Sequence, residues 1–507
     1  HLQSIHMIIH IIEHFCQKHK KIDQSEKELK ICLKCKFLPA QPRSKFLPYT
    51  ISCDILLPVA NSKEELFAFH FHQNKKTVRD RNLKQKKTFH LSLRRTWQLM
   101  TGGLSVVTLA ALCWALCLSA TLPDRYYLAK GSRFSLGDSS LIQTSSNDGY
   151  PLSVYSSTGN TFRMDLKLLG LINIKPVSVQ VVDRRVVALC GTPFGIKMVT
   201  DGVMVVGTGA VTDCNSRAVS PAQTAGIQEG DIILSINGEK ISSKKQLTKL
   251  VESSAGQPLS LVVRRGEQLT SLHLSPVRSS LDNSYHLGLW VRDSSAGIGT
   301  MTFYDPNNGC FAGLGHAICD VDTGQLMPLS QGEIVEASII GVHAGKSGSP
   351  GQLQGAFVAN RSIGSLYTNS YNGVYGRLLS QPVDAQTIPM AQCQEVRQGP
   401  VKILTTVSGQ KPQLFDACIE KLSLSQDEPT KNMVLRITDP DLLELSGGIV
   451  QGMSGSPIIQ DGMLVGAVTH VFVNDPTRGY GIFAENMDNT LLTVAAASQS
   501  RAAAPAA

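Results

Sequence analysis

The residues Gly-Met-Ser-Gly-Ser-Pro at 452–457 are followed by apolar runs at 458–460 and 463–468, which a Gly turn separates. The runs have the length and composition of paired β-strands. Flanking glycines permit backbone dihedrals that other residues rarely adopt, so such a turn can direct its N–H groups at a developing negative charge. The pattern predicts a nucleophilic serine, Ser454, with the N–H groups of Gly452 and Ser454 as oxyanion donors. A plain Gly/Ser turn is the alternative.

Composition favours a β-rich protein of two or three domains. The chain has 507 residues, 43 of them glycine, and only 6% are aromatic. The net charge of +8 is unevenly distributed, because residues 1–95 hold 19 Lys and Arg against 8 Asp and Glu. The remaining residues carry a net charge of −3, so we expect no nucleic-acid surface there.

Cysteine usage predicts neither a disulfide scaffold nor a metal site. The twelve cysteines are widely scattered, and six of them lie between Cys190 and Cys418. Cys32 and Cys35 form a single Cys-x-x-Cys pair without a matching second pair. A zinc knuckle that adds Cys16 or Cys53 is the alternative to unpaired thiols. We expect no cofactor and no metal.

The first 182 residues are interpreted as three segments. Residues 1–95 are a basic extension, either disordered or spurious, without sustained periodicity. Residues 96–122 contain a nearly uncharged run behind Arg94 and Arg95, which predicts a transmembrane helix or uncleaved signal anchor with the rest of the chain exported. A cleaved signal peptide is the rival. Residues 123–182 are rich in Gly, Ser and Asn and predict a linker leading into one or two strands.

Residues 183–278 resemble a PDZ domain of the bacterial peptidase-associated kind. The resemblance rests on the run Ala-Gly-Ile-x-x-Gly-Asp-Ile-Ile-x-x-Ile-Asn-Gly at 225–238. It implies a groove that takes an extended peptide end as an added strand. We expect this groove beside four residues of a glycine-bounded loop at 191–198: Phe194, Gly195, Ile196 and Lys197. A PDZ domain that only supports its neighbour is the alternative.

The serine turn occurs twice in the β-rich region 283–495. Residues 345–350 read Gly-Lys-Ser-Gly-Ser-Pro and repeat the pattern of 452–457. The turn also resembles the Gly-Asp-Ser-Gly-Gly-Pro signature of chymotrypsin-like serine peptidases. An internal duplication would give the two β-barrels of that fold, with Ser454 as nucleophile in the second and Ser347 as its structural counterpart. Residues 496–507 are expected to be a disordered tail.

The general base of such a site should be a histidine, because its neutral form can take the hydroxyl proton near neutral pH. Five histidines follow residue 95, and we expect His316, in a tight glycine turn before Ser454, to be the base. His470, on the strand after the nucleophile, is interpreted as a core histidine. The remaining three are His273, His286 and His343. From the residues alone, the acid that orients the imidazole is open between Asp320, Asp322 and Asp439.

Together these segments resemble the signalling serine peptidases of the stage IV sporulation protein B type, peptidase family S55, over roughly residues 99–495. The resemblance implies His316, Asp439 and Ser454 as the catalytic residues. It also implies an exported peptidase, anchored in the space between the two membranes of the developing forespore. Such a peptidase cuts itself and then the extracytoplasmic part of a membrane-bound regulator of an intramembrane metalloprotease, which triggers processing of a pro-sigma factor.

Two other functions remain possible from the sequence. One is a catalytically inactive PDZ adaptor, which would signal without Ser454. The other is a quality-control peptidase of the trypsin-like PDZ type. In those enzymes the PDZ domain usually follows the peptidase domain, whereas here it is expected to precede it.

Overall fold

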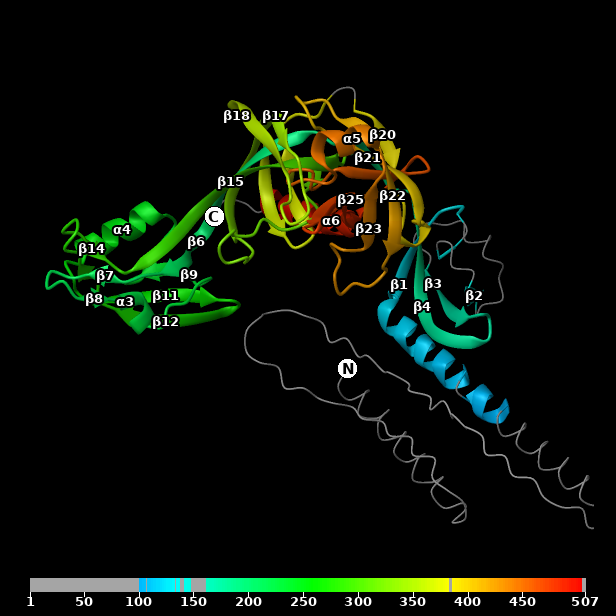
Figure 1. The fold of residues 1–507 in the computed structure, drawn as a ribbon, viewed down its shortest axis with the longest axis horizontal. Helices are drawn as coiled ribbons and strands as arrows, with labels where there is room; N and C mark the ends of the chain where they lie inside the picture. Colours follow the sequence, from blue (N-terminus) through cyan, green and yellow to red (C-terminus); the bar gives the residue numbers. More distant parts are fainter. Residues whose placement is uncertain are drawn as a thin grey trace, which may run out of the picture. The chain divides into compact units, whose positions relative to one another are not determined.

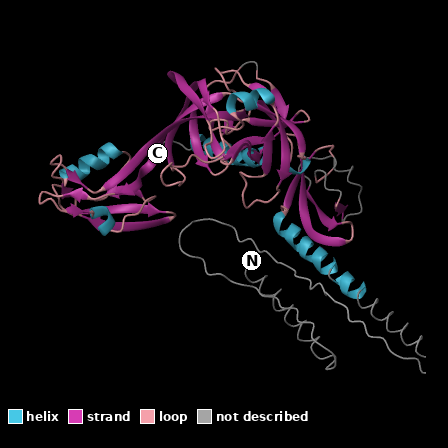
Figure 2. Ribbon diagram, viewed as in Figure 1, coloured by secondary structure: helices cyan, strands magenta, loops and turns pink. Residues whose placement is uncertain are grey.

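The computed structural model describes residues 100–503, except 106, 133, 137–140, 147–160 and 383–384. The predictions for residues 1–95 lie outside this part. Strands dominate the described chain (Figure 2). The helix Met100–Thr121 is long and apolar enough to cross a membrane. Lys175 Nζ donates hydrogen bonds to the carbonyl oxygens of Ser119 (3.1 Å) and Leu122 (2.6 Å), and so satisfies carbonyls at the end of this helix.

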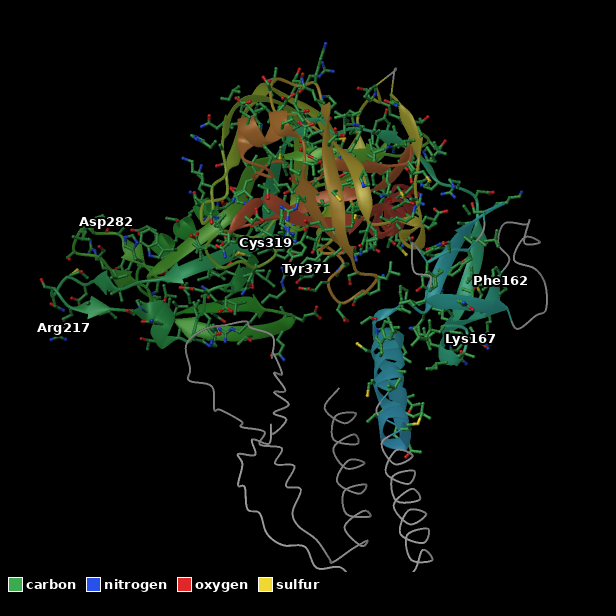
Figure 3. All side chains as sticks on the ribbon, turned by 45° about the vertical axis from the view of Figure 1, so that its right-hand side comes forward. Phe162, Lys167, Arg217, Asp282, Cys319 and Tyr371 are labelled. Carbon is green, nitrogen blue, oxygen red and sulfur yellow. The ribbon has the colours of Figure 1, made fainter. Side chains whose placement is uncertain are left out.

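A four-stranded sheet follows this helix, in the order β1-β4-β3-β2. Phe162 and Lys167, which Figure 3 labels, both belong to β3, whose residues Phe162, Met164 and Leu166 are buried. A linker leading into one or two strands was expected here; the structure adds two five-residue strands, β1 and β2, which become recognisable only through their pairing. The strands are β1 (Arg125–Ala129), β2 (Ile142–Ser146), β3 (Thr161–Leu168) and β4 (Ile172–Val182).

The first barrel has six strands, which close in the order β6-β15-β16-β19-β18-β17. They are β6 (Pro193–Thr208), β15 (Leu289–Tyr304), β16 (Cys310–Gly313), β17 (Leu329–His343), β18 (Gln352–Ser370) and β19 (Gly373–Leu378). Two short strands, β5 (Val186–Leu189) and β20 (Thr387–Pro389), extend the sheet beyond β15. Phe194, Phe311 and other apolar side chains fill this barrel.

The second barrel closes in the order β21-β22-β23-β26-β25-β24. Numbered along the chain within each barrel, both have the order first-second-third-sixth-fifth-fourth, as an internal duplication would produce. A 3₁₀ turn (Cys393–Glu395) precedes this barrel, and helix α5 (Pro440–Ser446) follows its third strand. The strands are β21 (Gly399–Thr405), β22 (Gln413–Leu422), β23 (Met433–Ile437), β24 (Pro457–Gln460), β25 (Met463–Phe472) and β26 (Asp475–Phe483).

The PDZ domain lies between the first two strands of the first barrel. Strands β6 and β15 leave the barrel, still paired with each other, and enter the part that carries α4 and β9 (Figure 1). The two domains therefore share strands, which differs from a division into 183–278 and 283–495. The other elements are β7 (Val211–Thr212), β8 (Ala218–Val219), α3 (Pro221–Thr224), β9 (Ile232–Ile236), β10 (Glu239–Lys240), α4 (Lys244–Ser253), β11 (Leu259–Arg265), β12 (Gln268–Leu274), β13 (Val277–Arg278) and β14 (Tyr285–His286).

The last element is helix α6 (Ala484–Ala503). It packs Met487, Leu491 and Ala495 into a core shared with both barrels. The expected disordered tail from residue 496 is therefore corrected as far as Ala503. The alanine-rich composition of this segment, which suggests disorder, also favours a helix.

Candidate active site

A tight turn after β16 carries His316. Leu314 and Gly315 both have positive φ, of 65° and 70°. A Cβ on Gly315 would lie 2.9 Å from Ile482 Cγ2 and 3.0 Å from Thr469 Cγ2, so the turn lies directly against the second barrel. Glycine is required here because its missing side chain permits both the dihedral and the approach. The turn therefore carries His316 from the first barrel to the surface of the second.

The Ser454 turn is fixed to β15 of the first barrel. The N–H of Thr300 donates to Ser454 O (3.1 Å). Gly455 has φ +94°, and a Cβ there would lie 2.0 Å from Thr300 O. No other residue fits at this position without displacing the backbone. The glycine after the serine thus allows one barrel to hold the Ser454 turn of the other.

His316, Ser454 and His470 line one cavity of about 470 Å³. Most of its other lining is apolar and comes from both barrels, including Met198 and Val471. Ser454 Oγ donates a hydrogen bond to Thr469 O at 2.9 Å. The predicted base and nucleophile therefore share a pocket, while the serine hydroxyl is bonded to a backbone carbonyl.

The environment of His316 suits a general base. Its Nδ1 lies 2.8 Å from Ala317 O. A carbonyl only accepts hydrogen bonds, so Nδ1 carries the proton and Nε2 keeps its lone pair. Burial lowers the pKa of His316, and the hydrogen bond to Ala317 only partly opposes this. His316 is therefore neutral at neutral pH, as a base must be.

His470 is part of the cavity, which differs from its interpretation as a core histidine. Its ring centroid lies 4.8 Å from that of His316, with an interplanar angle of 36°. Desolvation lowers the pKa of His470 to about 4, and repulsion from the charges of His316 and Lys431 adds to this. Both rings are neutral at neutral pH and can lie side by side. Within the described residues, no group of three or more His, Cys, Asp or Glu side chains could hold a metal ion.

The N–H groups predicted to be oxyanion donors are unbonded in the described structure. Gly452 has φ +98°. The hydrogen bonds in this part of the chain leave the N–H groups of Gly452 and Ser454 without a protein acceptor, whereas Met453 N–H donates to Val450 O. Unbonded N–H groups beside a nucleophile can stabilise a developing oxyanion.

Asp439 lies at the N-terminus of helix α5 and, among the described residues, is not hydrogen-bonded to the His316 imidazole, where a triad acid is expected. Its carboxylate accepts hydrogen bonds from the N–H groups of Asp441 and Leu442 (both 3.1 Å) and caps helix α5. The second oxygen accepts from Asp416 N–H at 3.1 Å. Burial alone would raise the pKa of Asp439, but these hydrogen bonds outweigh burial and lower it. No hydrogen bond joins Asp439 to His316 in the described chain.

The two other acids considered also serve the fold. Buried Asp320 binds Arg292 at 2.5 Å and accepts from Thr323 N–H and Oγ1. Asp322 binds the same guanidinium at 2.7 Å. Both acids therefore fix the loop after His316 to β15, and the acceptor at the imidazole is the carbonyl of Ala317.

Ser347 lies at a different position in its barrel. It is exposed in the turn between the fourth and fifth strands, β17 and β18, and Oγ donates to Asn474 O at 2.9 Å. Ser454 lies between the third and fourth strands of its barrel. Ser347 is therefore not the topological counterpart of Ser454, which corrects the expectation. The segment after the third strand of the first barrel carries His316 instead.

The expected peptide groove at Phe194–Lys197 is also corrected. Phe194 is 1% exposed and packs edge-on against Phe311 in the barrel core. Along these residues β6 pairs with β15 on one side and with β17 on the other. A peptide can add only to an unpaired strand edge, so this segment cannot accept one. The expectation treats the loop at 191–198 and the strand at 202–206 as parts of the PDZ domain. In the structure both belong largely to one long strand, β6, whose first half lies in the barrel.

Two threonines on β15 position the Ser454 turn, and the sequence analysis did not single them out. Thr300 Oγ1 donates to Gly452 O at 2.9 Å, and Thr302 Oγ1 donates to Gly455 O at 2.7 Å. Both side chains are at most 2% exposed. The run Gly-Thr-Met-Thr at 299–302 places two hydroxyls on one face of a strand, and this was the available signal.

Comparisons with known proteins agree with this architecture. Residues 283–488 match the family model of SpoIVB peptidase S55, and residues 215–265 match a PDZ domain. A curated relative named "Probable protease eep", from Enterococcus faecalis, is 32% identical over 80 residues, which cover 15% of this chain. The chain spans about 19% of the length of that relative.

Solved structures also resemble parts of the chain. The PDZ domain of the SdrC-like protein from Listeria monocytogenes is 17% identical and has a TM-score of 0.15, covering 18% of this chain and 87% of that one. The HtrA-type protease AlgW, solved with a decapeptide, is 11% identical with a TM-score of 0.25, covering 46% and 55%. The match over residues 283–488 makes this region similar to the SpoIVB-type S55 serine peptidases, and residues 215–265 are similar to a PDZ domain.

Proposed function

We propose that this protein is a membrane-anchored signalling peptidase of sporulation, in which Ser454 is the nucleophile and His316 the base. The observation that carries the proposal is the cavity shared by these two side chains, one from each barrel. It cuts itself and the extracytoplasmic part of a membrane-bound regulator of an intramembrane metalloprotease, which triggers processing of a pro-sigma factor. The match to the SpoIVB peptidase model supports this pathway.

The proposed chemistry is acyl transfer to a serine. Ser454 Oγ attacks the scissile carbonyl and His316 Nε2 takes the hydroxyl proton. The N–H groups of Gly452 and Ser454 stabilise the oxyanion. His316 then protonates the leaving amine, and water hydrolyses the acyl-enzyme with His316 again as base.

The acceptor at His316 Nδ1 is a backbone carbonyl, Ala317 O, at 2.8 Å. It fixes the tautomer, as a carboxylate does in a Ser-His-Asp triad, but it adds no negative charge beside the imidazolium. The proposed mechanism is therefore a Ser-His dyad, and Asp439 acts through the stability of helix α5. This predicts a slower enzyme than one with a complete triad, which suits a peptidase that cuts few substrates.

The bond from Ser454 Oγ to Thr469 O must exchange for one to His316 before attack. Rotation about χ1 of Ser454 breaks one hydrogen bond and makes another, so it has a small net cost. The same bond is the observation that favours the alternative function, an inactive PDZ adaptor. An adaptor would keep the hydroxyl permanently on the carbonyl.

The helix Met100–Thr121 supports a membrane anchor. In the proposed arrangement the basic flank stays in the cytoplasm and the PDZ and peptidase domains lie in the space between the forespore membranes. Lys175, on β4, binds carbonyl oxygens at the end of this helix and so fastens the helix to the four-stranded sheet.

Purified full-length protein in detergent micelles tests the peptidase. We expect a fluorophosphonate probe to label the wild type and the Ser347→Ala variant, and not the Ser454→Ala variant, with self-cleavage following the same pattern. In sporulating cells, the Ser454→Ala protein should accumulate uncut and leave the pro-sigma factor unprocessed. Normal processing in cells with this variant would support the adaptor and refute the proposal.

A further inference from the structure

One strand joins the PDZ domain to the nucleophile turn. Strand β15 pairs with β6 from Leu289 to Thr300 and with β16 only from Met301 onward. Its first residues lie in the PDZ domain, where Lys244 N–H at the start of α4 donates to Asp293 Oδ2 at 2.8 Å. Its Thr300 holds the Ser454 turn. The two domains are therefore connected by a single run of extended backbone.

The direction of the backbone groups along this strand follows from Thr300. Its N–H donates to Ser454 O and its carbonyl accepts from Leu314 N–H, so both groups point away from β6. The register between Ser294 and Thr300 is regular. Because backbone groups alternate with a period of two, the N–H and C=O groups of Ala296 and Ile298 point the same way as those of Thr300.

This edge of β15 is open. In the described chain no strand pairs with it before Met301, and Ser294, Ala296 and Gly297 are exposed. At the PDZ end, α4 lies beside β15, and Leu250, Leu289 and Val291 are only partly buried there. An unpaired edge with apolar side chains at one end is suited to an extended peptide.

We propose that one extended segment of the substrate binds along this whole edge, so that the PDZ domain and Ser454 hold the same segment at a fixed spacing. The segment is the part of the substrate on the carboxyl side of the scissile bond. This proposal rests on the proposed function.

The direction of β15 sets the polarity of that segment. The strand runs toward Ser454, whereas the carboxyl-side segment runs away from it, so the two pair antiparallel. The carboxyl end of the segment then lies at the start of β15, beside α4. The edge from Leu289 to Ile298 is ten residues long, or about 30 Å of strand, and includes two register shifts against β6, between Trp290 and Val291 and between Arg292 and Ser294. The strand therefore acts as a ruler, with cleavage about ten residues before the end that the PDZ domain holds.

Peptides of graded length test the ruler on the full-length protein in detergent. Each has a randomised cleavable segment, a threonine-rich spacer of about 4, 7, 10 or 13 residues, and an apolar carboxyl-terminal tail. Cleavage products are identified by mass spectrometry. We expect kcat/KM to peak near the ten-residue spacer, about tenfold above the same peptide without a tail. Equal rates at all lengths would overturn the proposal.

N-methylation of the spacer tests the pairing without altering the protein. Methylation of a residue whose N–H faces β15 should lower kcat/KM about three- to tenfold, since it removes one hydrogen bond, whereas methylation of the next residue should not. If the loss of kcat/KM does not alternate between successive methylated positions, the peptide does not pair with β15 as an antiparallel strand. In the protein, Ala296→Pro removes an N–H from the open edge and should abolish the dependence on spacer length.

Two further outcomes would each overturn the ruler for a different reason. If the wild type cleaves no peptide at all, with or without a tail, the proposed peptidase function is wrong. The proposed binding of a substrate along β15 is then wrong as well, because it requires that function. If Ala296→Pro converts a dimer into a monomer in light scattering, the occupant of the edge is a second copy of the chain, and the substrate track is wrong.

Discussion

Replacement of Thr300 or Thr302 by valine should slow catalysis without touching the reacting atoms. Valine keeps the shape of the buried side chain and removes only the hydroxyl. The variants lose the hydrogen bonds to Gly452 O (2.9 Å) and Gly455 O (2.7 Å), respectively. These carbonyls belong to the turn that carries the proposed nucleophile, Ser454, and the proposed oxyanion donors.

The magnitude follows from the burial of these groups. A buried carbonyl without its donor costs about 1–3 kcal/mol of folding stability. If about 1–2 kcal/mol of this appears as poorer alignment in the transition state, kcat falls by about 5- to 30-fold, because each 1.36 kcal/mol is a factor of ten. KM should change little, since neither hydroxyl lines the cavity.

Thr406→Val is the matched control. Thr406 is also buried, and its hydroxyl donates to a glycine carbonyl, Gly191 O, at 2.9 Å. It does not line the active-site cavity. All three variants should lose similar thermal stability, measured by calorimetry on the full-length protein, whereas only the β15 variants should lose kcat on a cleavable peptide. Equal kcat in all three would refute the positioning role of β15.

Three further predictions concern the site residues. Ser454→Ala should abolish fluorophosphonate labelling, while Ser347→Ala retains it, because Ser347 is exposed and bonded to a distant loop; the reverse result would exchange their roles. Asp439→Ala should lower stability by about 1 kcal/mol through loss of the helix cap, seen as a lower denaturant midpoint, with kcat unchanged; a large fall in kcat at unchanged stability would restore Asp439 as the triad acid. Because burial lowers the pKa of His316, the neutral base should persist as pH falls below about 6.5, and kcat/KM should decline only at more acidic pH; a decline centred above this value would contradict the buried environment.

Local sequence patterns were enough to predict several features of this protein. The Ala-Gly-Ile run at 225–238 identified the PDZ domain, and the glycine turn at 452–457 identified the serine peptidase. The uncharged run after Arg95 predicted the helix Met100–Thr121. Each of these signals lies within a few residues, where turn geometry and side-chain periodicity directly constrain the backbone.

The pairing of the strands and the surroundings of each acid depend on contacts between distant parts of the chain. An apolar strand such as β6 has the same sequence pattern in a PDZ sheet and in a barrel, so the peptide groove was misplaced onto residues that are paired on both sides. Likewise, an aspartate before proline can be a catalytic acid or a helix cap, and the sequence pattern is the same in both cases. Asp439 is a helix cap because its carboxylate accepts hydrogen bonds from the N–H groups of Asp441 and Leu442. Strand pairing joins residues far apart in the chain, and no local pattern specifies the partner.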